Sequence, residues 1–197
     1  MARVAAGEKH GLDAVRWARE ISKCRKSFEY FAANYLTILS RQRIAATTLK
    51  FNPVQAFLWK EMLKQKRQDG WIRQIWGKPR KIGATTLARG LSFWLTAFQK
   101  HRKSLLVTHD EPSSHEVFAQ QDLNFYTSLP PPMRPQVNFQ SKSKLNFQKA
   151  GSTSMCGHAR NLNVGVTQVY DIMHLTEAAR YRDAEMVIKS SLFPSLS

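Results

Sequence analysis

The stretch Trp71–Gly90 reads WIRQIWGKPRKIGATTLARG, and the interpretation of the whole chain starts from it. Bulky apolar side chains recur over 71–76, which predicts a short strand. A basic loop bounded by Gly77 and Gly83 follows, and the apolar spacing over 85–99 then predicts a helix. A strand, a glycine-bounded loop and a helix in this order are typical of a turn that binds phosphate at a helix N-terminus.

The loop departs from the common P-loop spacing, Gly-x4-Gly-Lys-Ser/Thr. Ala84 stands where that pattern has its lysine, and Lys78 stands where it has its first glycine. Arg80 and Lys81 add two cations inside the same loop. We interpret Lys78, at the entrance of the loop, as the cation that reaches back over the β- and γ-phosphates of a nucleotide.

Small and hydroxylated residues lead from the loop into the helix. Gly83 and Ala84 let the backbone approach an anion closely. Thr85 is the expected Mg²⁺ ligand, and Thr86 supplies a second hydroxyl. Taken alone, the same residues also fit a basic strand-to-helix turn that is capped by a threonine.

A second stretch, YDIMHLTEAARY over 170–181, follows an apolar strand pattern over 166–175. Glu177 comes directly after this strand. A carboxylate at the end of a buried strand is where NTPases place the group that orients the attacking water. The alternative is an ordinary early helix residue that is favoured by the helix dipole.

Composition limits the class of protein. The chain has 197 residues, of which 43% are hydrophobic, so it can bury a sizeable core and is not a disordered tail. Its formal charge of +16 predicts a polyanionic partner, although a basic, inert surface is the alternative. The two cysteines favour a reduced intracellular setting over a disulfide scaffold, and no apolar run approaches the roughly 18 residues of a membrane span.

Periodicity predicts helices and strands in alternation, which indicates an α/β domain with a mainly parallel sheet. The expected helices lie within 11–39 and over 54–66, 85–99, 111–126 and 183–192. The expected strands cover 71–76, 104–108, 136–140, 144–148, 152–156 and 166–175.

Four of these motifs together resemble the large terminase subunits, the motors that package viral DNA. KPRKIGATTLARG is similar to the variant Walker A loop of that family, and HLTEAARY is similar to its Walker B ending. FNPVQ over 51–55 stands where the family keeps an adenine-recognising glutamine, and SLLVTHDEPSSHEVF over 104–118 resembles the strand and polar loop after the P-loop helix. The motifs follow the family's order across roughly residues 28–193.

This resemblance implies a P-loop NTPase core of the RecA-like ASCE class over 51–197, with a small N-terminal helical subdomain over 1–50. It implies an ATPase that uses ATP and Mg²⁺ to drive double-stranded DNA into a procapsid, in the cytoplasm of the host cell and without a membrane. The implied partners are DNA, a small terminase subunit, the portal and further copies in a ring. The family's Ser/Thr-rich coupling motif and nuclease domain do not follow before Ser197, so we expect an incomplete ATPase domain.

The resemblance also assigns roles to individual residues. Glu177 would be the catalytic carboxylate, assisted on the phosphates by Lys78 and Arg80. Thr176 stands where the family usually has an acidic residue, so Mg²⁺ would be held partly through water. Arg160 and Arg180 are the candidates for an arginine finger. The implied nucleotide-binding set is Gln55, Lys78, Arg80, Lys81, Gly83, Ala84, Thr85 and Thr86.

Two other functions stay open on the sequence. A DNA-binding or assembly module of the same fold, without turnover, is favoured by Ala84 in the lysine position. A helicase-type ATPase is disfavoured, because HLTEAA replaces an Asp-Glu pair. The acidic and histidine residues over 109–116 lack zinc-like spacing, and we interpret them as a polar loop that opens a helix.

Overall fold

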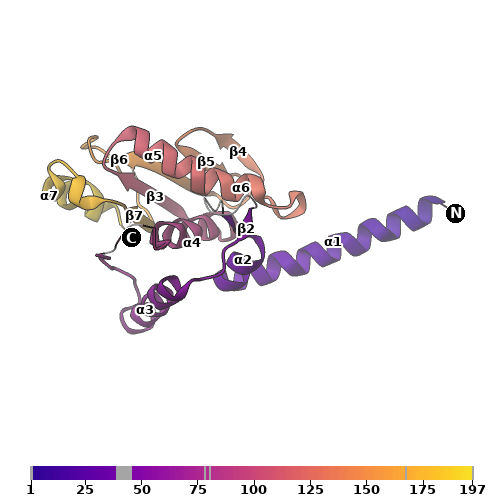
Figure 1. Ribbon diagram of the computed structural model, residues 1–197. Coiled ribbons are helices and arrows are strands. Elements are labelled where there is room, and N and C mark those ends of the chain that lie inside the picture. The colour runs from indigo at the N-terminus through magenta and orange to yellow at the C-terminus, as the bar shows by residue number, and fades with distance from the viewer. Residues whose placement is uncertain (1, 39–45, 78, 80, 167, 197) are drawn as a thin grey trace.

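The protein is described from a computed structural model, which covers residues 2–38, 46–77, 79, 81–166 and 168–196, with side chains from residue 13 onward. Helices pack around one five-stranded sheet, and a long N-terminal helix projects from this body (Figure 1). The chain therefore has the α/β architecture that its sequence predicts.

The sheet is mixed, and this corrects the expectation of a mainly parallel one. The strands lie in the order β4-β5-β6-β3-β7, and β3 pairs in parallel with both β6 and β7. The other two pairings are antiparallel, because the predicted hairpin joins β6 at the edge of the same sheet. The strands are β3 (Lys103–Thr108), β4 (Val137–Gln140), β5 (Lys144–Phe147), β6 (Ser152–His158) and β7 (Ile172–Leu175).

The inner strand β3 is covered on both faces, which explains its continuous apolar sequence. Leu106 belongs to the larger hydrophobic cluster, together with side chains of the helices that precede β3. Leu105 and Val107 point to the opposite face and belong to a second cluster, formed with the C-terminal segment. The sheet is thus the middle layer of three.

Helices on the larger-cluster side come mostly from the first two thirds of the chain. Ser27 caps α2, because its hydroxyl accepts a hydrogen bond from the Tyr30 N–H at 3.0 Å. Asn52 and Gln55 form a capping box at the start of α3. The elements are α1 (Ala2–Lys26), α2 (Phe28–Tyr35), β1 (Thr37–Ile38), β2 (Thr47–Thr48), α3 (Pro53–Asp69), α4 (Ala84–Phe98), α5 (Glu111–Phe118), the π-helix η1 (Ala119–Leu123), α6 (Asn124–Ser128) and η2 (Pro131–Met133).

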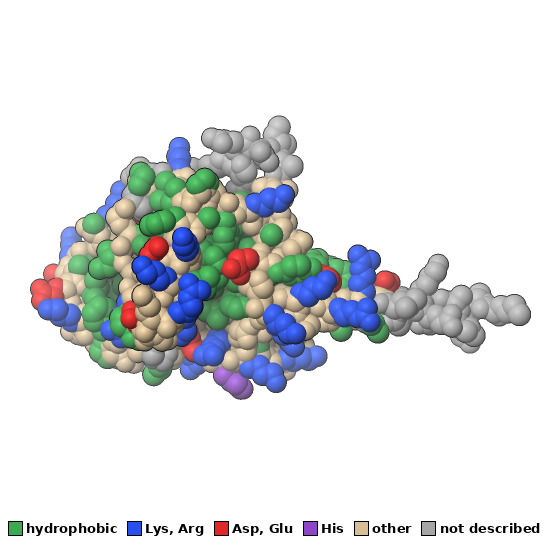
Figure 2. All heavy atoms as spheres, turned by 90° about the horizontal axis from the view of Figure 1, so that it is seen from below, with side chains coloured by type: hydrophobic (Ala, Val, Ile, Leu, Met, Phe, Trp, Pro, Cys, Tyr) green, Lys and Arg blue, Asp and Glu red, His purple; other side chains and the backbone are tan. Residues whose placement is uncertain are grey.

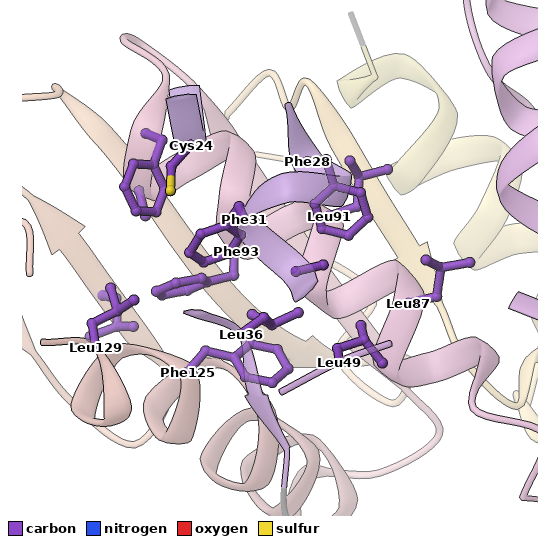
Figure 3. Close-up of a cluster of buried hydrophobic side chains, with 14 of the residues drawn as sticks. Cys24, Phe28, Phe31, Leu36, Leu49, Leu87, Leu91, Phe93, Phe125 and Leu129 are labelled. Carbon is purple, nitrogen blue, oxygen red and sulfur yellow. The ribbon is translucent and has the colours of Figure 1, made fainter. Parts of the chain in front are cut away.

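Aromatic side chains from these helices fill the larger cluster (Figure 3). Phe31 of α2 stacks on Phe93 of α4, with ring centroids 6.3 Å apart, and Phe93 meets Phe125 of α6 edge to face at 5.7 Å. These rings are fully or almost fully buried. The N-terminal helices therefore share one core with the helix that carries the glycine-bounded loop.

The C-terminal segment covers the other face of the sheet with short helical pieces. Val187 and Leu192 are buried there against β3. Tyr181 anchors this segment, because its hydroxyl donates to the carbonyl oxygen of Val107 at 2.8 Å. The pieces are η3 (Ala178–Arg180), α7 (Ala184–Met186), the π-helix η4 (Val187–Leu192) and η5 (Phe193–Ser195).

Two strand predictions are wrong in whole or in part. Residues 71–76 belong to no strand, and Ile75 is fully exposed. The segment is held by local contacts, such as the Arg73 N–H bonded to the Gln65 side chain, and not by a neighbouring strand. The strand expected over 166–175 begins only at Ile172. Val166 lies in a turn, and Tyr170 makes an isolated parallel bridge with Leu196 instead of joining the sheet.

Candidate functional site

The carboxyl ends of the parallel strands bring the predicted site residues to one edge of the sheet. A short connection joins α4 to β3, so the two run in opposite directions and α4 begins beyond the carboxyl end of β3 (Figure 1). Glu177 follows β7, which is parallel to β3, so it lies at the same edge. We call this set the carboxyl-edge site: residues 81–86, His109, Asp110, Glu177 and Arg180. Ligands of α/β sheets bind in this position.

The loop before α4 uses backbone conformations that expose N–H groups. Gly83 is the N-cap of α4 with φ 81°, and Lys81 also has a positive φ, of 68°. Among the residues that the structure describes, none makes a side-chain cap hydrogen bond at the start of α4. The free N–H groups of a helix start favour an anion. Lys78 and Arg80, which the sequence assigns to the phosphates, lie outside the described residues.

The capping box of α3 holds this loop. The Gln55 side-chain Nε2 donates to the Gly83 carbonyl oxygen at 2.9 Å, and Asn52 Nδ2 donates to the Ile82 carbonyl oxygen at 3.1 Å. Gln55 is buried, and its Oε1 accepts from the Asn52 N–H at 3.0 Å. Gln55 therefore lies against the loop, where its amide binds the protein backbone. Adenine recognition by Gln55 stays a prediction.

The hydroxyl groups at the start of α4 remain within reach of solvent. Thr85 and Thr86 are half-buried, whereas Ala84 is fully buried. In the part of the chain that the structure describes, no three His, Cys, Asp or Glu side chains gather as a metal cluster. A hydroxyl that holds Mg²⁺ together with nucleotide phosphates fits this donor set, since such sites retain several waters.

Glu177 has a strained backbone and a loosely held side chain. Its φ of 57° and ψ of 38° place it in the left-handed region, which non-glycine residues rarely adopt outside constrained sites. Its side chain is 49% exposed, and Oε2 lies 3.4 Å from His109 Nδ1 and 3.3 Å from Arg180 Nη1. The carboxylate is therefore positioned by two nitrogens and still open to water.

The segment after β3 contributes His109, which sequence reasoning treated only as part of a polar loop. Asp110 caps α5, as that interpretation implies, and its Oδ1 accepts from the Ser113 N–H at 3.0 Å. These hydrogen bonds with Ser113, and the charges of His109 and Arg160, hold the pKa of Asp110 below its ordinary value. His109 directly follows a buried strand, and Glu177 follows a strand after a single residue. This position after a strand is the sequence signal that could have identified His109 as a site residue.

The two candidate arginine fingers differ in their surroundings. Arg180 contacts Glu177 of its own chain, and Arg160 is exposed beyond β6. Thr176 is buried, and its N–H donates to the Val107 carbonyl oxygen at 2.9 Å, which fixes the chain just before Glu177. Asp171 lies at the opposite edge, paired with Arg102 at 2.5 Å.

Basic side chains gather on the helices α1 and α3. Figure 2 shows many Lys and Arg side chains, and few acidic ones, over these helices. The exposed basic residues are Arg16, Arg19, Lys23, Arg25 and Lys26 in α1, and Lys60, Lys64, Lys66 and Arg67 in α3. Such a surface attracts the phosphates of a nucleic acid.

Comparison with known proteins gives no assignment: no protein-family model matches the chain, and no curated protein matches it in sequence. Among the described residues, none of the helices has the length and apolarity needed to cross a membrane.

Proposed function

We propose that this chain is an ATPase unit of a viral DNA-packaging motor of the large-terminase type, built on a P-loop fold. One observation carries the proposal: the glycine-bounded turn that opens α4 and the carboxylate that follows β7 share the carboxyl edge of the parallel strands. This is the relation between phosphate loop and water-orienting carboxylate that ATP hydrolysis requires.

The residues of the carboxyl-edge site divide the proposed reaction among them. The N–H groups of the first turn of α4 would bind the phosphates of ATP, with Lys78 and Arg80 as neutralising cations. The Thr85 hydroxyl would hold Mg²⁺, which when bound offsets charge on the phosphate oxygens. Glu177 would accept a proton as the water oxygen attacks the γ-phosphorus and the bond to the β–γ bridging oxygen breaks, releasing ADP.

The partners of this proposed motor are those that the resemblance implies: double-stranded DNA, a small terminase subunit, the portal of a procapsid and further copies in a ring. The exposed basic residues of α1 and α3 support DNA as the first of these.

Phosphate release from ATP, measured with and without double-stranded DNA, tests the proposal. We expect Glu177→Gln to lower turnover by about 10²–10⁴-fold, the usual contribution of a positioned general base, without weakening nucleotide binding. Glu185→Gln is the matched control, because Glu185 is exposed and forms a surface ion pair with Lys189. Lys78→Ala should instead weaken ATP binding in calorimetry. Equal turnover of the native chain and Glu177→Gln would remove Glu177 from the reaction.

A second function is favoured by the basic helices themselves. A DNA-binding module without turnover would use α1 and α3 and leave the carboxyl-edge site idle. DNA binding by the native chain without phosphate release, at any DNA concentration, would favour this function over the ATPase.

A further inference from the structure

The imidazole of His109 lies between two carboxylates of different elements. Its Nε2 is 3.3 Å from Asp110 Oδ2, and its Nδ1 is 3.4 Å from Glu177 Oε2. Only 21% of the side chain is exposed. Nδ1 itself is shielded from solvent and lies at ion-pair distance from Glu177, without the alignment of a hydrogen bond. A small movement of the Glu177 carboxylate would therefore complete that bond.

One side of this arrangement is fixed by secondary structure. Asp110 is held as the N-cap of α5 by its bond to the Ser113 N–H, and its backbone carbonyl accepts from the Thr108 hydroxyl at 2.7 Å. His109 is thus attached to the rigid end of β3 and braced by a fixed carboxylate. The Glu177 side chain, in contrast, is half exposed and follows the strand β7 at the edge of the sheet.

The contacts of Glu177 are confined to one of its oxygens. His109 Nδ1 and Arg180 Nη1 both approach Oε2. Within the described part of the chain, Oε1 has no hydrogen bond or ion pair. These two contacts are at ion-pair distance and not hydrogen bonds. Two nitrogens near the same oxygen favour one orientation of the carboxylate and leave the other oxygen for a third group.

We propose that His109 is a positioning residue for Glu177: it holds the carboxylate by Oε2, so that Oε1 faces the attacking water. This inference rests on the proposed ATPase function and adds a residue to its machinery. Asp110 orients the imidazole from its other side, and Arg180 supports the same oxygen from η3. A misplaced general base loses rate without losing substrate affinity, because the carboxylate does not bind the nucleotide.

The positioning role is tested by two variants of His109, each of which mimics a different ring nitrogen. His109→Asn retains an amide donor near the position of Nδ1, whereas His109→Gln retains one near Nε2. We expect His109→Ala and His109→Gln to lower kcat by about 10–100-fold. The nucleotide Kd should stay within about 3-fold of the native value, and His109→Asn should recover a large part of kcat. His115→Ala is the control, since His115 faces Glu111 on α5 and not Glu177.

Equal losses in His109→Asn and His109→Gln, or a loss of nucleotide affinity that matches the loss of kcat, would overturn the positioning role. A structural role alone would lower the melting temperature of all three variants without separating Asn from Gln.

A measurement that needs no turnover separates this inference from the proposed function. The imidazole resonances of His109 in the native 197-residue chain should shift in Glu177→Gln and remain unchanged in Glu185→Gln. Resonances that do not respond to Glu177→Gln would refute the contact, whether or not the chain hydrolyses ATP. A resonance shift in a chain that does not hydrolyse ATP would support the contact between His109 and Glu177 and refute the proposed ATPase function.

Discussion

Two groups of charged side chains in this molecule have opposite surroundings. The interior cluster consists of Arg89 of α4, Asp122 of η1 and the serines Ser154 and Ser104 of the sheet, and all four are fully buried. The carboxyl-edge site has its charges at the surface, where Glu177 and Arg180 are about half exposed. Each group includes residues of α4. The carboxyl-edge site is open to a ligand, whereas the interior cluster is not.

Contact geometry separates the two groups further. Arg89 binds Asp122 through two hydrogen bonds of 2.9 and 2.5 Å, and Ser154 donates to the same carboxylate at 2.8 Å. The contacts of Glu177 are longer, at 3.3 and 3.4 Å, and lack hydrogen-bond alignment to His109. Buried charges that are paired through short, aligned hydrogen bonds serve the fold, whereas loosely paired charges at a strand end remain available for chemistry.

The largest effect that separates the two groups is expected from Asp122→Ala. It leaves the Arg89 guanidinium buried without its carboxylate, which should lower the free energy of unfolding by about 3–5 kcal/mol. Arg180→Ala, which breaks an exposed pair, should lower it by about 1 kcal/mol or less. Urea unfolding of both variants provides the comparison.

The control for this prediction removes both interior charges together. Arg89→Met with Asp122→Leu should recover most of the stability that Asp122→Ala loses, because no buried charge is left uncompensated. Similar losses in Asp122→Ala and Arg180→Ala would erase the distinction between the two groups.

Local patterns account for most of what the sequence predicted about the fold. The helix over 84–98, the buried strand over 103–108 and the hairpin over 137–147 follow from spacing that neighbouring residues impose. The segment 71–76 has similar bulky residues but forms no strand, because a strand also requires a partner from elsewhere in the chain. Arg89 pairs with a residue 33 positions away, and spacing within one helix does not reveal such a pairing.

The candidate site was predictable where a residue directly follows a strand or opens a helix. Glu177 and residues 83–86 were found in this way, and the structure brings them to one edge. Gln55 was predicted to contact a nucleotide, and its bond to the Gly83 carbonyl depends on how α3 packs beside the loop. His109 was missed because its role depends on the neighbouring strand β7, which lies far along the chain.

The next largest effect is expected at Gly83, and Gly70 is its matched control. Both have left-handed backbones, with φ 81° and 77°. A Cβ at Gly83 would lie 2.6 Å from Gln55 Nε2, whereas a Cβ at Gly70 would meet nothing within 4 Å. Gly70→Ala should therefore cost about 1 kcal/mol of backbone strain, and Gly83→Ala should cost about 1 kcal/mol more through the displaced Gln55.

Nucleotide affinity makes the glycine comparison more specific. Gly83→Ala should weaken ATP binding in calorimetry, because it alters the turn whose N–H groups would hold the phosphates, and Gly70→Ala should not. Equal behaviour of the two variants in stability and affinity would mean that the loop at Gly83 is no more constrained than an ordinary helix end.

The smallest effect concerns pH and the charge of the half-buried Asp110. Its folded pKa lies below the ordinary value, first because of the hydrogen bonds from Ser113. A lowered folded pKa gives stability that is fully present above the unfolded pKa, near 4, and that is lost as the pH falls through the folded pKa.

Asp110→Asn keeps a good helix cap without the charge. At pH 6 the native chain should therefore have a higher melting temperature than Asp110→Asn. This difference in melting temperature should shrink as the pH is lowered to 2.5. Asp110→Ala, which has no cap, should remain less stable throughout. A native advantage over Asp110→Asn that grows on acidification would mean that the carboxylate of Asp110 is destabilised in the fold, and that this part of the carboxyl-edge site stores strain where favourable hydrogen bonds are expected.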